Sequence, residues 1–83
     1  MKLLYFAWVR ERVGTASEEL ACPDGVATVG DLVGWLAGRG SGYAEAFEDT
    51  AMVRAAVNQE HVDVSHPVAD GDEIAFFPPV TGG

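Results

Sequence analysis

The chain has 83 residues, a length typical of one small domain. Thirteen acidic residues against five basic ones give a formal net charge of −8, and a surface of that sign repels nucleic acid. We therefore expect no nucleic-acid partner. The only cysteine cannot form an internal disulfide, and no run approaches the ~20 apolar residues of a membrane span. We expect a cytoplasmic protein with no membrane partner.

The N-terminal part predicts two strands joined by a short helical segment. Residues 2–8 have high β-propensity, with apolar side chains on both faces. Val9 and Val13 are four residues apart and Gly14 follows, which predicts one helical turn that ends at a glycine. A second strand is predicted over residues 18–22, so that the two strands form a hairpin with a widened loop.

The main helix is predicted to begin after Thr28. The Thr28 hydroxyl can accept a backbone hydrogen bond, and Asp31 occupies the third helical position, which is typical of helix capping. We expect this helix to end at Gly40 and a shorter helical piece to cover residues 43–48. The apolar stripe of the main helix consists of Val29, Leu32, Val33 and Leu36.

Three further strands are predicted in the second half of the chain. They cover residues 53–57, 62–64 and 73–77, with turns at Asn58-Gln59-Glu60 and Asp70-Gly71. Isolated strands around one main helix favour an α+β fold over a doubly wound sheet, which needs repeated βαβ units. The sequence therefore predicts a mixed sheet of about five strands packed on one main helix.

The last predicted strand carries aromatic side chains on both of its faces. If Ile74 and Phe76 face the helix, alternation turns Ala75 and Phe77 to the other face of the sheet. Phe6 can share that face, because the first and last strands are expected to be neighbours. We interpret Phe77 and Phe6 as partner-binding residues.

The side chains do not predict a conventional active site. His61 and His66 are expected on the surface, and no Cys/His/Asp/Glu grouping has the spacing of a metal site. Serine-nucleophile and phosphate-loop motifs are also absent from the sequence. We expect no bound metal or cofactor, and no enzymatic activity of the chain on its own.

The C-terminal residues carry the chemistry instead. Residues 78–83 are predicted to form a flexible, extended tail beyond a domain of residues 1–77, with a reach of roughly 20 Å. Two terminal glycines lack a Cβ and can pass through a narrow channel. We expect Gly82 to occupy that channel and the α-carboxylate of Gly83 to reach an active site beyond it. That carboxylate can be activated as an acyl-adenylate and converted to a thiocarboxylate. The other expected partner-binding residues are Pro78, Pro79, Val80 and Thr81.

Residues 70–83, with support from residues 5–14 and 55–59, resemble the small subunit of molybdopterin synthase. The resemblance covers essentially the whole chain and is most specific in its last fourteen residues. It implies a ubiquitin-like β-grasp fold in which the C-terminal strand lies beside the N-terminal one. It also implies a sulfur carrier as the function.

The same resemblance implies two partners. A ubiquitin-activating-type adenylyltransferase would use ATP to adenylate Gly83 before its thiocarboxylation. The tail would then enter the synthase large subunit, within a heterotetramer, and pass sulfur to precursor Z (cyclic pyranopterin monophosphate) to form the dithiolene of molybdopterin. Two alternatives stay open: a sulfur carrier for another acceptor (the thiamine thiazole, a tRNA base or an amino-acid pathway), and a ubiquitin-like protein modifier.

Overall fold

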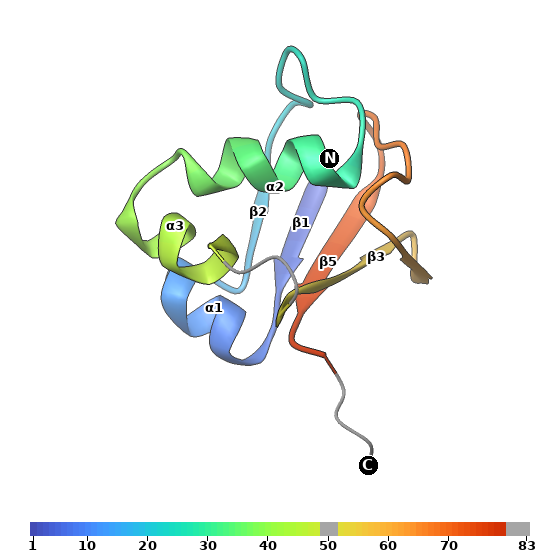
Figure 1. The fold of residues 1–83 in the computed structure, drawn as a ribbon. Helices are drawn as coiled ribbons and strands as arrows, with labels where there is room; N and C mark the ends of the chain where they lie inside the picture. The colour runs from blue at the N-terminus through green and yellow to red at the C-terminus, as the bar shows by residue number, and fades with distance from the viewer. Residues whose placement is uncertain (49–51, 80–83) are drawn as a thin grey trace.

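The structure, a computed structural model, describes residues 1–48 and 52–79 (Figure 1). The described strands form one sheet in the order β2-β1-β5-β3-β4, in which β1 and β5 are parallel and the other pairs antiparallel. This confirms the mixed sheet, the place of the last strand beside the first, and the bounds of the last strand. In chain order the elements are β1 (Lys2–Tyr5), α1 (Ala7–Val13), β2 (Ser17–Glu19), α2 (Val29–Ala37), α3 (Ser41–Phe47), β3 (Arg54–Val57), β4 (Glu60–Val62) and β5 (Glu73–Phe77).

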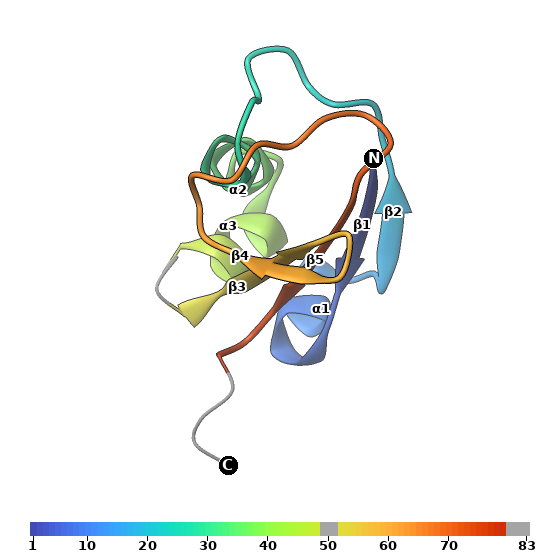
Figure 2. The same ribbon diagram turned by 90° about the vertical axis from the view of Figure 1, so that its right-hand side faces the viewer.

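The core lies between one face of the sheet and the helices α2 and α3, which pack on that face (Figures 1 and 2). The predicted stripe of α2 is buried, and burial alternates along β1 and β5 as their side chains point in turn to this core and to the other face of the sheet. In β3 the last three residues, 55–57, are all buried. No helix of the described ranges is long and apolar enough to cross a membrane. The buried cluster consists of Leu3, Tyr5, Val9, Val29, Leu32, Val33, Leu36, Ala46, Phe47, Ala55, Val57, Val68, Ile74 and Phe76.

The ends of α2 are set by local chemistry. The Thr28 hydroxyl accepts the Asp31 N–H at 3.2 Å, and the Asp31 carboxylate accepts the Thr28 N–H at 3.3 Å. This reciprocal pair confirms the predicted cap. The prediction that the helix ends at Gly40 is wrong: the helix ends at Ala37, where Gly38 donates its N–H to the Trp35 carbonyl at 3.2 Å. Gly40 is instead the N-cap of α3.

The first strand is shorter than predicted. β1 ends at Tyr5 because Ala7 has a positive φ of 52° and begins α1. The carbonyl of Phe6 accepts the N–H groups of Val9 and Arg10 at 3.1 and 3.3 Å. The prediction of a strand through Trp8 is therefore wrong, since these helical hydrogen bonds override the β-propensity of the segment.

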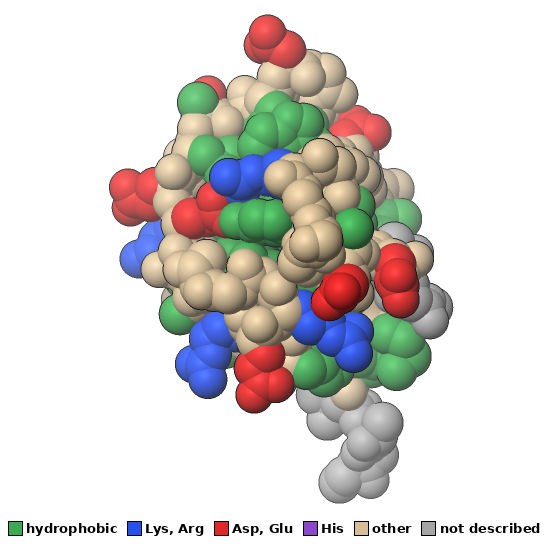
Figure 3. Space-filling model, turned by 90° about the vertical axis from the view of Figure 1, so that its left-hand side faces the viewer, with side chains coloured by type: hydrophobic (Ala, Val, Ile, Leu, Met, Phe, Trp, Pro, Cys, Tyr) green, Lys and Arg blue, Asp and Glu red, His purple; other side chains and the backbone are tan. Residues whose placement is uncertain are grey.

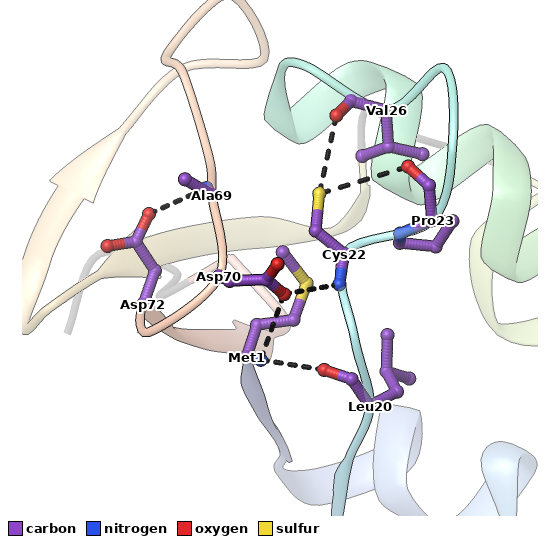
Figure 4. Close-up of polar contacts among 8 residues, drawn as sticks. All are labelled: Met1, Leu20, Cys22, Pro23, Val26, Ala69, Asp70 and Asp72. Atoms are coloured by element: carbon purple, nitrogen blue, oxygen red, sulfur yellow. Dashed lines mark hydrogen bonds and ion pairs between the residues drawn. The ribbon is translucent and has the colours of Figure 1, made fainter.

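The second strand is displaced from its prediction. Gly14 caps the end of α1, with a φ of 94° and an N–H that donates to the Arg10 carbonyl. Strand β2 then ends at Glu19, where the chain leaves the sheet. In the loop that follows, the Cys22 N–H donates to the Asp70 carboxylate at 2.6 Å, a contact between distant segments (Figure 4). The Cys22 thiol turns toward the Val26 carbonyl, 3.4 Å away. Cys22 is thus a loop residue, not part of a strand.

The chain after β4 crosses the N-terminus of α2 (Figure 2). The carbonyls of Val64 and His66 accept the N–H groups of Gly30 and Val29 at 2.9 and 3.0 Å. These groups are among the N–H donors that have no partner within the helix. The predicted continuation of the strand to Val64 is wrong, because satisfying the helix end takes this segment out of the sheet.

Candidate functional site

The face of the sheet turned away from α2 and α3 is the candidate binding surface, and we call it the outer face. It is defined by strand alternation, since its residues lie between the buried positions of each strand and in register with one another. Five of these side chains are apolar, and the two cations, Lys2 and Arg54, share the face with the carboxylates of Glu19 and Glu73. The outer face consists of Lys2, Leu4, Phe6, Ser17, Glu19, Arg54, Ala56, His61, Glu73, Ala75 and Phe77.

Phe77 and Phe6 lie where the alternation predicted. Ile74 and Phe76 have no exposed surface, whereas Phe77 is half-buried. Phe6 is 48% exposed, and its N–H donates to the Phe76 carbonyl at 3.1 Å, which holds Phe6 beside the end of β5. The parity of Phe77 and its shared face with Phe6 are confirmed. The role of both residues in partner binding stays a prediction.

His61 belongs to the same face, whereas the sequence predicted only a surface position for it. Its ring centroid lies 5.1 Å from that of Phe77, with the ring planes tilted by 47°. The two strands that carry these residues are separated by β3, where Ala56 stands opposite His61 in register and is only 7% exposed. A methyl group at Ala56 leaves room for the rings to meet. In the sequence, the pairing of residues 60–62 with residues 55–57 was the signal that could have placed His61 on this face.

The root of the tail lies at the edge of this face. β5 is hydrogen-bonded to β1 on one side and to β3 on the other, and it ends at Phe77. Pro78 and Pro79 follow outside the strand, half-buried; neither has an N–H to continue the ladder. β5 ends at Phe77, and the division into a domain of residues 1–77 and a tail of residues 78–83 stays a prediction. Four predicted site residues lie outside the described residues: Val80, Thr81, Gly82 and Gly83.

A polar cluster is centred on Glu18, whose carboxylate forms an ion pair with Arg39 at 2.7 Å. Figure 3 shows acidic and basic side chains that adjoin one another on the face that it draws. The Glu18 carboxylate accepts the hydroxyl of Tyr5 at 2.9 Å, the hydroxyl of Tyr43 at 2.7 Å and the guanidinium of Arg39 at 2.7 Å. Arg39 also stacks over the rings of Tyr43 and Trp35, at 4.7 and 5.1 Å. Because it joins β1 and β2 to α3 and to the segment before it, we interpret the cluster as structural.

Burial and hydrogen bonding act against each other on the Glu18 carboxyl. Burial raises the pKa of Glu18, but the hydrogen bonds from Arg39, Tyr43 and Tyr5 outweigh that effect and hold the pKa below its ordinary value. Burial, followed by the hydrogen bond to Glu18, raises the pKa of Tyr5. The carboxylate is therefore the ionised acceptor of the cluster, and both tyrosines are its donors.

Within residues 1–48 and 52–79, no group of three or more His, Cys, Asp or Glu residues could hold a metal ion. His61 is exposed on the outer face and His66 is half-buried beside α2, so the structure does not bring the two histidines to one strand or loop.

Comparisons with known proteins agree over the full chain. Residues 3–83 match the ThiS family. The molybdopterin synthase sulfur carrier subunit of Escherichia coli (strain K12) is 49% identical over 83 residues, with 100% of this chain and 99% of that protein covered. SAMP1, the small archaeal modifier protein 1 of Haloferax volcanii, has a TM-score of 0.73 at 32% identity, with 100% and 98% of the two chains covered. A complex of subunits 1 and 2 of the Helicobacter pylori molybdopterin-converting factor has a TM-score of 0.63 at 22% identity, with 99% and 96% covered, a likeness of fold.

Proposed function

The chain belongs to the ThiS family, and we propose that it is the sulfur carrier subunit of a molybdopterin synthase, with the α-carboxylate of Gly83 as its working group. The observation that carries this proposal is the fixed exit of the tail. A strand held on both sides ends at Phe77, at the edge of the outer face, and two prolines direct the chain away from it. The carboxylate of Gly83 is thus tethered a few residues from a binding surface.

The chemistry follows from a carboxylate that needs activation. Attack of the Gly83 carboxylate on ATP, in the active site of a ubiquitin-activating-type adenylyltransferase, would form an acyl-adenylate and release pyrophosphate. A sulfur donor would then displace AMP and leave a thiocarboxylate. ATP is a substrate of the activating enzyme in this scheme, and the carrier itself needs no bound cofactor.

The thiocarboxylate is a nucleophile on a narrow arm. Gly82 and Gly83 have no Cβ, so this end can enter a channel that a larger residue would block. In the large subunit of the synthase, sulfur would pass to precursor Z and build the dithiolene of molybdopterin. The Helicobacter pylori complex of subunits 1 and 2 supports a large-subunit partner, and we extend this to a heterotetramer.

The outer face is the surface that we assign to these partners. Phe6, half exposed, and Phe77 present aromatic rings beside the exit of the tail, and aromatic residues are enriched among the residues that dominate binding energy. A partner that accepts the tail must come close to this edge of the sheet. Pro78, Pro79, Val80 and Thr81 would line the path between the face and the channel.

A protein modifier is the second candidate function. The likeness to the small archaeal modifier protein 1 of Haloferax volcanii favours it, because a modifier would use the same activated Gly83 carboxylate. The two functions differ in the product: a thiocarboxylate for the sulfur carrier, and an amide bond to a lysine of a target protein for the modifier. Mass spectrometry of the protein isolated from cells separates them.

The proposal is tested at the last residue. Deletion of Gly83 moves the reacting carbon by about 3.3 Å or more, and extension of the chain beyond Gly83 replaces the free carboxylate with an amide bond. We expect both forms to fold and both to lose ATP-dependent activation and molybdopterin formation, since a positioned reaction tolerates no such displacement. The measurements are pyrophosphate release with the activating enzyme and molybdopterin yield with the large subunit.

Two controls make the result decisive. Thermal unfolding of both forms must match that of the unchanged chain. Gly82→Ala, which adds one methyl group, is expected to retain more transfer than Gly82→Leu, which fills the channel. Near-normal sulfur transfer by the extended form, with its added residues still present by mass, would overturn the proposal.

A further inference from the structure

The strongest nucleophiles of the chain lie at one end of the sheet. Lys2 is the only lysine and Cys22 the only cysteine, and amines and thiols are the groups that attack an activated carboxyl most readily. Lys2 begins β1. The Asp70 carboxylate accepts the Cys22 N–H at 2.6 Å and lies 3.9 Å from the α-amino nitrogen of Met1 (Figure 4). Both amines and the thiol therefore belong to the end of the sheet where β1 begins.

The tail leaves from the opposite end of the sheet (Figure 1). β1 and β5 run parallel with Lys2 opposite Glu73, so Phe77 lies four residues farther along, about 13 Å from the level of Lys2. The two prolines that follow carry the chain about 6 Å farther in the extended conformation that proline favours, and the four residues after them span about 13 Å at most. A return of about 19 Å to the backbone of Lys2 is therefore too long for Gly83, and even an extended lysine side chain leaves no slack.

The lysine and arginine positions near the root of the tail are all arginines. Arg54 on β3 stands opposite Phe77 in register. Arg10 and Arg12 belong to α1, which begins where β1 ends, beside the end of β5. A guanidinium stays protonated in proteins, so it does not attack a carbonyl carbon as a lysine amine does. Positive charge is thus present at this end of the sheet without an amine.

We propose that arginine in place of lysine beside the root of the tail, at Arg54 above all, is a specificity determinant that keeps the activated carboxyl of Gly83 for an external sulfur donor. This inference rests on the proposed function, because it takes the acyl-adenylate of Gly83 as the reacting group. A lysine amine at position 54 would attack the carbonyl carbon of Gly83 and form an amide bond. The bond from that carbon to the AMP oxygen breaks, AMP leaves with the electron pair, and the amine gives its proton to water. The chain is then closed into a ring and lost to sulfur transfer.

Position 54 is within reach of the tail, whereas Lys2 is not. Neighbouring strands lie about 5 Å apart, and the six residues after Phe77 span roughly 20 Å, which is enough to turn back to the next strand. A reaction within one molecule then proceeds at an effective concentration in the millimolar range. The imidazole of His61, 5.1 Å from the ring of Phe77, does not trap the tail in this way, because water cleaves an acyl-imidazole and returns the carboxylate.

The test uses the full chain with a thioester at Gly83 in place of the acyl-adenylate, so that it does not depend on the activating enzyme. At micromolar concentration the unchanged chain should lose its thioester only by hydrolysis. Arg54→Lys should lose it on the order of tenfold faster, because the amine is tethered to the carbonyl. Its product should be a monomer with a mass one water below that of the free acid. Hydroxylamine cleaves thioesters but not amides, and therefore separates this product from a thioester with Cys22.

The matched control combines Arg54→Lys with Lys2→Arg, which keeps the net charge and the single lysine but moves that lysine to the other end of the sheet. It should form the ring as Arg54→Lys does, whereas Lys2→Arg alone should behave as the unchanged chain. Arg10→Lys supplies a second position if Arg54→Lys does not fold. Ring closure in the unchanged chain through Lys2, or hydrolysis alone in the folded variants with a lysine near the tail, would overturn the inference. The proposed function would then still stand, since pyrophosphate release with the activating enzyme tests it separately.

Discussion

The carbonyl oxygen of Arg12, in the last turn of α1, lies 2.5 Å from the position that a Cβ atom on Gly42 would occupy. The backbones of α1 and α3 therefore meet at a distance that only glycine permits. The packing of these two short helices depends on one missing side chain. Because the contact is with backbone, a new side chain could not be accommodated by a rotamer change.

Gly42→Ala is predicted to destabilise the fold by about 2 kcal/mol, since overpacking forces the backbone to shift. Urea unfolding gives the free energy directly. The matched control is Gly34→Ala in α2, where a Cβ would have no atom within 4 Å. That change should stabilise the protein by up to about 1 kcal/mol through helix propensity. Equal changes in the free energy of unfolding for the two substitutions would show that the close contact between α1 and α3 does not exclude a side chain at Gly42.

The Glu18 cluster predicts a loss of stability in acid. The pKa of Glu18 in the folded protein lies below its ordinary value of 4.5, so its stabilising contribution is present above that value and is lost as pH falls through the folded pKa. Glu18→Gln should destabilise the fold at pH 7 by on the order of 1–2 kcal/mol, because charge-assisted hydrogen bonds are replaced. The difference between the two proteins should shrink as the pH falls below 4.5 and through the lowered folded pKa of Glu18.

Thermal unfolding as a function of pH measures this effect, and Glu19→Gln supplies the control. Glu19 is exposed on the same strand, so its replacement should change stability little at either pH. A difference between the Glu18→Gln form and the unchanged chain that stays constant down to pH 3 would contradict the predicted role of the carboxylate charge.

Phe77→Ala is predicted to fold but to bind the large subunit and the activating enzyme weakly. Its side chain lies on the outer face, outside the buried cluster, and truncation of a binding hot spot costs about 2 kcal/mol, or roughly 30-fold in affinity. Val64→Ala is the control, because Val64 is 57% exposed but lies beside α2. Calorimetric titration with each partner measures the affinity. An unfolded Phe77→Ala protein whose folded fraction binds with normal affinity would contradict the prediction.

Local chemistry made parts of this fold predictable from the sequence. The reciprocal cap of Thr28 and Asp31 involves residues three apart, and the stripe of α2 follows from helical periodicity alone. The bounds of β5 and the parity of Phe77 follow from alternation within one segment. The proposed working group, Gly83, also came from the sequence, because the absence of a Cβ at Gly82 and Gly83 follows from the residue types alone.

Only the tertiary structure decided the outcome where two elements of secondary structure compete for the same backbone hydrogen-bonding groups. β1 gives way to α1 at Phe6, and Val64 leaves the sheet because its carbonyl accepts an N–H from the start of α2. The meeting of His61 and Phe77 across Ala56 depends on the register of three strands. Propensity and periodicity describe one segment at a time, whereas these contacts join residues distant in sequence, and their energies arise only when the strands pair.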